Sequence, residues 1–137
     1  MTWEPGHVFE PQSYAVTRAD LVRYAGASGD FNPIHWSDRV ASSVELPGVI
    51  AHGMYTLALA SRAVTLWVGH PASVQSFGAR FTKPVPVPDD DTGTVIEVAG
   101  VVKSAEAGTA TIDVTVTNGG AKVLGMCKAV VRTDRDD

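Results

Sequence analysis

"IAHGMYTLALASRAVTLWVGH", residues 50–70, is the stretch that decides the fold. Apolar residues and alanines fill nearly every position, so they would cover all faces of a helix. A helix that is apolar all round is typical of a buried element. At 1.5 Å per residue it would run for about 30 Å, the width of a small domain. Gly69 and Pro71 mark its end, because glycine favours a helix C-terminus and proline cannot continue the helix.

The chain after this helix is rich in Val, Thr and Ile in alternating patterns, which favour strands. We predict strands over 73–82, 93–104, 109–118 and 121–133. "NGG" at 118–120 predicts a tight hairpin. The texture of the sequence therefore changes from helical before residue 70 to strand-rich after it.

The chain before the long helix predicts two shorter helices after an extended lead-in over 1–16. Thr17 is a candidate N-cap with Asp20 as its capping-box acid, and Gly26 would end the helix over 18–26. Ser37 would cap a second, short helix within 37–44.

A long apolar helix followed by antiparallel strands predicts an α+β fold in which one sheet wraps around the helix. This arrangement is the hotdog architecture, and we expect residues 1–137 to form one such domain. An open sheet edge attracts a second chain, so the fold also predicts pairing with another subunit.

Composition excludes several classes of protein. The 137 residues carry a net charge of −4 and contain no basic run, which argues against nucleic-acid binding. The single cysteine, Cys127, falls in a predicted strand as a small core residue and favours a reducing compartment. Residues 1–12 do not resemble a signal peptide, and the longest weakly polar stretch, 46–61, is too short and polar to cross a bilayer. We expect a soluble cytoplasmic protein.

"SGDFNPIH", residues 28–35, concentrates hydrogen-bonding groups in one short turn. Asn32-Pro33 favours a tightly determined bend, because proline fixes its own φ and restricts the residue before it. Such a bend could aim Asp30 and His35 at one water molecule as a proton-transfer pair. The alternative is that Asp30 and Asn32 only cap the next segment while His35 packs on Trp36.

"AHGM", residues 51–54, lies at the start of the long helix, where free N–H groups and the helix dipole attract negative charge. Gly53 would let a ligand approach the backbone closely, as an oxyanion hole requires. Alternatively, Gly53 only allows tight packing against the sheet. Ser61 lies about two turns further on a similar face. Asp30, His35 and His52 could also form a metal set, but their spacing is not that of helical ligands.

"YAGASGDFNPIHWSDRVA", residues 24–41, resembles the signature of the MaoC-like dehydratases, or (R)-specific enoyl-CoA hydratases. That signature contains an aromatic residue, small residues, G-D-x-N-P-aliphatic-H, five further residues and then Ala or Ser. "IAHGM" at 50–54 and "RFTKPVPVPDD" at 80–90 extend the resemblance over almost the whole chain. Within the family, the sequence is similar to the mycobacterial (3R)-hydroxyacyl-ACP dehydratases.

The resemblance implies a hotdog fold and reversible syn addition of water to a trans-2-enoyl thioester. It implies that Asp30 and His35 hold and activate the water, that the Gly53 N–H polarises the thioester carbonyl, and that Ser61 and Asn32 support the site. It requires no cofactor and no metal. The expected partners are an acyl-CoA or acyl-ACP substrate and, in a homodimer or heterodimer, a second hotdog subunit. Candidate contacts for the carrier's phosphates are Arg62, Arg80 and Lys83.

Two other functions remain open from the sequence. Thioesterases share the hotdog fold, but many place a catalytic carboxylate on or near the central helix, and 49–69 contains none. The chain could instead be a structural partner that completes the tunnel of another subunit. In heteromeric dehydratases of the family one subunit lacks the Asp/His pair, whereas this chain keeps both Asp30 and His35.

Overall fold

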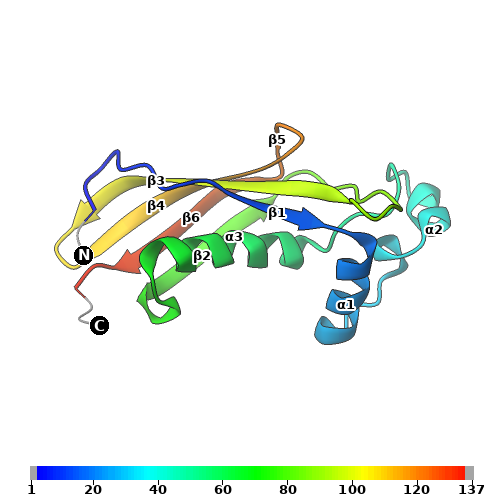
Figure 1. Ribbon diagram of the computed structural model, residues 1–137, viewed down its shortest axis with the longest axis horizontal. Helices are drawn as coiled ribbons and strands as arrows, with labels where there is room; N and C mark the ends of the chain where they lie inside the picture. Colours follow the sequence, from blue (N-terminus) through cyan, green and yellow to red (C-terminus); the bar gives the residue numbers. More distant parts are fainter. Residues whose placement is uncertain (1–2, 135–137) are drawn as a thin grey trace.

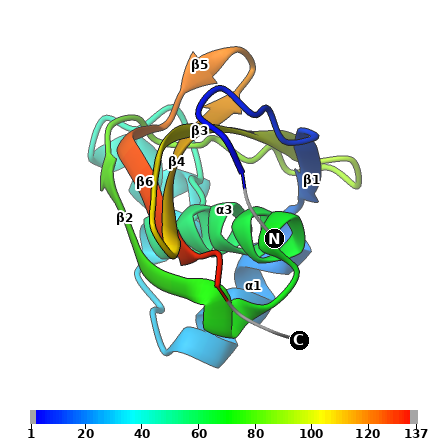
Figure 2. The ribbon, with the colours of Figure 1, turned by 90° about the vertical axis from the view of Figure 1, so that its left-hand side faces the viewer.

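One antiparallel sheet lies over one long helix in the structure, a computed structural model that describes residues 3–134. The helix is α3 (Gly53–Val68), and the sheet order is β1-β3-β4-β6-β2, with β5 paired to β4. The strands are β1 Gln12–Val16, β2 Val74–Phe81, β3 Thr94–Glu106, β4 Thr109–Asn118, β5 Ala121–Lys122 and β6 Leu124–Arg132. Figure 1 shows the sheet along the helix, and Figure 2 shows it curling around the helix axis. The predicted α+β hotdog fold is confirmed.

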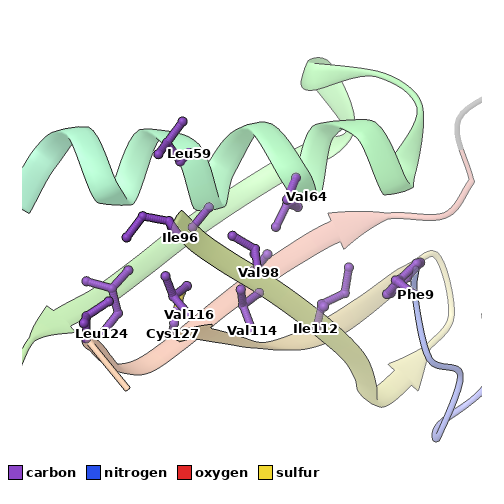
Figure 3. Close-up of a cluster of buried hydrophobic side chains, with 14 of the residues drawn as sticks. Phe9, Leu59, Val64, Ile96, Val98, Ile112, Val114, Val116, Leu124 and Cys127 are labelled. Carbon is purple, nitrogen blue, oxygen red and sulfur yellow. The ribbon is translucent and has the colours of Figure 1, made fainter. Parts of the chain in front are cut away.

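The core lies between α3 and the concave face of the sheet (Figure 3). Alternate residues of β3 and β4 point toward the helix and are buried, as the period of two in their sequences predicts. Leu59 and Val64 of α3 meet this face from the other side. Cys127 of β6 is buried, as predicted, and burial raises the pKa of its thiol to about 11. The helix is thereby fixed along the sheet.

The start of α3 differs from the prediction of a helix over 50–70. Residues 50–52 are extended, because Ile50 forms a bridge with Pro86 and the Ala51 N–H donates to the Val85 carbonyl at 2.9 Å. The helix ends at Val68, and Gly69 takes the left-handed conformation with φ 88°. A short 3-10 turn, η2 (Pro71–Ser73), then leads into β2. The apolar pattern of 50–52 fits a strand as well as a helix, and the neighbouring backbone decides between them.

The prediction that α3 is buried on every face is wrong. One face packs on the sheet, whereas Met54 is 56% exposed and Leu66 is 61% exposed. A single sheet covers only one side of a helix, so the opposite apolar side lies uncovered in the single chain.

The first helix, α1 (Arg18–Ser28), begins with the predicted capping box. The Thr17 hydroxyl accepts a bond from the Asp20 N–H, and the Asp20 carboxylate accepts one from the Thr17 N–H at 2.9 Å. The helix passes through Gly26, the predicted end, and stops two residues later. Gly29 adopts φ 78° there, a left-handed conformation that glycine takes without steric cost.

The last predicted strand, 121–133, is broken into β5 and β6. Val123 lies between them, donating its N–H to Val116 and accepting the Thr82 N–H. The predicted hairpin at "NGG" is present, and Gly119 and Gly120 both have positive φ, at 58° and 81°. Two successive residues with positive φ match the twist of adjacent strands, which explains the choice of glycine.

The second helix, α2 (Asp38–Ser43), is capped by Ser37 as predicted and is held to α1 by an ion pair. Arg18 contacts both carboxylate oxygens of Asp38, at 2.9 and 3.1 Å, and also donates to the Val87 carbonyl. Asp38 further accepts the Val49 N–H at 2.9 Å; this bond and Arg18 hold the pKa of Asp38 below its usual value. Together, these contacts of Arg18 and Asp38 fix the loop that precedes α3.

We expect Gly93→Ala to destabilise the fold by about 2–4 kcal/mol. Gly93 has φ 67°, and an added Cβ would lie 1.9 Å from the backbone oxygen of Val16. Chemical denaturation with urea measures the loss. Gly119→Ala is the matched control, because Gly119 has φ 58° but no atom within 4 Å of an added Cβ. Equal losses for the two variants would show that the close approach contributes nothing.

No helix within residues 3–134 is long and apolar enough to span a membrane.

Candidate active site

The turn that carries Asp30 is braced by its own side chains. The Asp30 N–H donates to the Ser28 hydroxyl at 3.1 Å, and Asp30 Oδ1 accepts the Asn32 N–H at 3.2 Å. Asn32 Oδ1 in turn accepts the Ile34 N–H at 3.2 Å and caps the 3-10 turn η1 (Pro33–His35). Asn32 therefore supports the backbone and does not line the cavity described below. Asp30 keeps its second oxygen, Oδ2, free of this bracing.

His35 is turned toward that second oxygen. Its Nδ1 lies 2.7 Å from the Ile50 carbonyl oxygen, and because a carbonyl only accepts, Nδ1 carries the proton. In the neutral ring, Nε2 then holds a lone pair, 3.9 Å from Asp30 Oδ2. This separation is too long for a direct hydrogen bond but allows one water molecule to contact both atoms. The His35 ring is 8% exposed, while the Asp30 side chain is half exposed.

His52 contacts both members of this pair. Its ring stacks on the His35 ring with centroids 3.8 Å apart and planes 21° apart. Its Nε2 donates to the backbone carbonyl of Asp30 at 3.1 Å. Burial is the largest influence on His52 and lowers the pKa of its ring below the usual value. The alternative in which His35 packs on Trp36 is wrong, because Trp36 is 56% exposed and its indole N–H donates to the Phe31 carbonyl.

Gly53 begins α3 beside the two histidines. His52 lies at the N-cap position without a side-chain cap bond, so the N–H groups of the first turn receive no acceptor from it. The ring of Phe81, at the end of β2, lies over the glycine. A Cβ added to Gly53 would lie 3.0 Å from Phe81 Cε1, so glycine allows this close approach. The positive end of the helix dipole is thus available to a ligand at Gly53.

A cavity of about 460 Å³ brings three of the predicted residues together. Asp30, His35 and Gly53 all line it, as does Lys83 at an exposed position. The remaining lining residues come from the η1 turn, the start of α3 with the residues before it, the end of β2 with the loop after it, and the start of β6. They are Ile34, Ile50, Ala51, His52, Met54, Thr56, Phe81, Thr82, Pro84, Val85, Val123 and Leu124. Most of these side chains are apolar, so the cavity suits an acyl chain with a polar group at one end.

Several predicted contacts lie outside this cavity. Ser61 is half-buried on α3 and is not part of the lining, which takes Thr56 from the first turn of the helix instead. Arg62 lies over the ring of Tyr14, 5.3 Å from its centroid. Arg80 is exposed on β2 and does not line the cavity either. Of the three predicted phosphate contacts, only Lys83 is at the cavity.

The candidate metal set fits a metal ion poorly. Asp30, His35 and His52 each have one ligand-type atom within 4.8 Å of the others. However, the two rings are nearly parallel and stacked, so their in-plane lone pairs run side by side instead of converging on one point. One nitrogen of each ring also already donates to a backbone carbonyl. The arrangement matches a water-binding pair better than a coordination sphere.

Sequence reasoning missed the structural role of His52 and the position of Thr56. His52 precedes the helix by one residue, and the seventeen-residue gap to His35 follows no helix or strand period. Its position beside Gly53 was the available signal, since any side chain at the N-cap lies close to a ligand at the helix end. Thr56 could have been found by projecting one turn from Gly53 along the helix.

Comparisons with known proteins agree with this geometry. Residues 2–122 match the family model described as the MaoC like domain. The chain is 40% identical over 73 residues to 3-hydroxyacyl-thioester dehydratase X of Mycobacterium tuberculosis, a match that covers 53% of this chain and 25% of that protein. The chain therefore spans well under two thirds of the length of this relative.

Two solved structures are similar over nearly the whole chain. A MaoC-like dehydratase superposes with a TM-score of 0.91 at 36% identity, covering 95% of this chain and 40% of that one. The R-hydratase PhaJ1 from Pseudomonas aeruginosa has a TM-score of 0.82 at 26% identity, covering 98% of this chain and 84% of that one. With its hotdog fold and a family match over residues 2–122, the chain belongs to the MaoC-like dehydratase domain family.

Proposed function

We propose that the chain is an (R)-specific hydratase/dehydratase that interconverts trans-2-enoyl thioesters and (3R)-hydroxyacyl thioesters. The observation that supports this most is the opening of Asp30, His35 and Gly53 into one largely apolar cavity. A base, a carboxylate and a helix N-terminus are the groups that addition of water to an enoyl thioester needs. The names of the dehydratase and hydratase relatives point to the same chemistry.

The proposed reaction starts with a water molecule held between Asp30 Oδ2 and His35 Nε2, which are 3.9 Å apart. Nε2 takes one proton of the water as its oxygen bonds to C3 of the enoyl group. The π electron pair of the C2–C3 double bond forms a C1–C2 double bond, and the π pair of the carbonyl moves onto the thioester oxygen, where the Gly53 N–H stabilises the negative charge of the enolate. The protonated pair then returns a proton to C2 from the same side, which makes the addition syn. Dehydration follows these steps in reverse.

We propose a CoA or acyl-carrier-protein thioester as the substrate. Lys83 is an exposed cation on the lining of the cavity, where it can meet a phosphate of either carrier. The acyl chain would occupy the apolar part between α3 and the residues around Val123. No cofactor takes part in the proposed steps.

We further propose that the working form is a homodimer or a heterodimer with a second hotdog subunit. The uncovered side of α3 exposes Met54 and Leu66, and β2 pairs only with β6 among the described strands. An open strand edge next to exposed apolar side chains is a surface that a second chain can cover. Size-exclusion chromatography with light scattering would give the state of the chain alone.

Hydration of crotonyl-CoA and of longer enoyl-CoAs by the purified chain, alone and with a candidate partner subunit, tests the function. We expect loss of the conjugated enoyl thioester and formation of the (3R)-hydroxyacyl product, read with a stereospecific dehydrogenase. EDTA should leave the rate unchanged, and strong inhibition would favour a metal site instead. Release of free thiol without hydration would favour a thioesterase, although α3 carries no carboxylate.

A further inference from the structure

The proposed reaction leaves the buried imidazole of His52 without a role. His52 is 1% exposed, and its Nδ1 is the one buried side-chain nitrogen or oxygen in residues 3–134 that has no hydrogen-bond partner. Buried polar groups nearly always have a partner, so a histidine kept here calls for an explanation. An apolar residue of similar size would fill the space without leaving Nδ1 unpaired.

The contacts of His52 reach both members of the catalytic pair. Its Nε2–H holds the backbone carbonyl of Asp30 at 3.1 Å, and its ring covers one face of the His35 ring. Asp30 is thereby anchored at its carbonyl as well as at its N–H and Oδ1, which leaves Oδ2 for the water. His35 is anchored at Nδ1 and along one face, which leaves Nε2.

The surroundings of His52 favour the neutral ring. The ionisable groups packed around it are Asp30 and His35 of the turn and Tyr24 of α1, whose ring lies 4.7 Å away, with Tyr55 of α3 behind Tyr24. Protonation at Nδ1 would bury a second cation against the proton-accepting His35 and leave the new N–H unpaired. A neutral ring, in contrast, presents an aromatic face to the imidazolium that His35 becomes.

We propose that His52 is a positioning residue that acts as a neutral imidazole, fixing the Asp30 backbone through Nε2–H and supporting protonated His35 through its ring face. The inference rests on the proposed function, because it assigns His52 to the Asp30–His35 pair. In this role His52 touches neither the water nor the thioester. It supports the two residues that activate the water.

Nitrogen-15 NMR of the native chain between pH 5 and 8 tests the neutral state without any substitution. We expect His52 to show the neutral Nε2–H tautomer at neutral pH and still predominantly at pH 6.5. Because burial lowers its pKa, the neutral form should persist below pH 6.5, where an unperturbed histidine gains its proton. A His52 ring that titrates at or above pH 6.5 would overturn the inference.

Two variants separate the two contacts. His52→Gln keeps an N–H donor for Asp30 but removes the ring, whereas His52→Phe keeps a ring but removes the donor. We expect both to lower kcat about 10-fold with little change in KM, because misplaced catalytic groups lose rate and not binding. In His52→Gln the acid limb of the pH profile of kcat/KM should move to lower pH, because the aromatic support of the His35 imidazolium is lost. In His52→Phe the acid limb should stay close to that of the native chain.

These outcomes distinguish failure of the inference from failure of the proposed function. If the native chain hydrates enoyl-CoA while both variants keep its kcat and its pH profile of kcat/KM, His52 does not position the pair. If the native chain shows no hydration, the proposed function fails, and nitrogen-15 NMR of the native chain still decides whether the His52 ring is neutral. Circular dichroism melting shows whether each variant is folded, and the measurement on the native chain stands if neither is.

Discussion

His35→Ala is expected to lower the turnover of enoyl-thioester hydration at least ~100-fold while leaving the fold intact, on the usual scale of general acid–base catalysis. The ring supplies the lone pair at Nε2, 3.9 Å from Asp30 Oδ2, that accepts the proton of the water. Initial rates at saturating crotonyl-CoA give kcat, and thermal unfolding checks the fold.

Asp30→Asn should cause a loss of the same order, because the amide keeps the shape of the side chain but cannot hold the water as a carboxylate does. His7→Ala is the matched control, since His7 is exposed on the N-terminal segment and lines a different cavity. Native-like rates in both His35→Ala and Asp30→Asn would remove the pair from the chemistry. They would favour the alternative in which the chain is a structural partner of another subunit.

Gly53→Pro alone is expected to lower kcat about 10²–10³-fold relative to the native chain, because it removes one N–H at the oxyanion site. Proline lacks this N–H but is well tolerated at the first position of a helix. The preceding residue, His52, has φ −59° and ψ 132°, which is the extended backbone that a following proline requires. The substitution therefore removes the donor while α3 can still begin at the same place.

Gly53→Ala is the control for the size of the proline ring. It places a Cβ against the Phe81 ring at the same 3.0 Å approach but keeps the N–H. Phe81 is 57% exposed and can move aside, so the alanine variant should lose much less rate than the proline variant. Equal kcat values for Gly53→Pro and Gly53→Ala would show that the N–H carries no charge stabilisation and that glycine serves packing alone.

The sequence predicts the fold class because its strongest signals agree with one another. The apolar stretch around Leu59 and the alternating strands after residue 73 leave few arrangements other than a sheet around a helix. Element ends were less predictable, since Gly26 and Gly29 carry the same propensity and only the later one coincides with the turn to Asp30. The extended conformation of 50–52 depends on hydrogen bonds to the 85–86 backbone, which no local pattern encodes.

The candidate site is predictable to the extent that one short motif contains it. Asp30 and His35 lie five residues apart around a proline, so the sequence alone brings them near each other. The stacking of His52 on His35 joins a turn to a helix start through tertiary packing, and sequence spacing gives no measure of it. For Ser61, counting turns from Gly53 did not show that the cavity reaches only the first turn of α3. The catalytic roles themselves stay predictions until the variants are measured.

The extended residues 50–52 before α3 contact both His35 and the backbone at Val85. The Ile50 carbonyl holds the proton of His35 Nδ1, and the next N–H along the chain, that of Ala51, is held by the Val85 carbonyl. These two hydrogen bonds connect the His35 ring to the backbone at Val85, two residues after Lys83. The orientation of the His35 ring is therefore tied to the position of the Val85 backbone, so a substitution that displaces this backbone should also displace the ring.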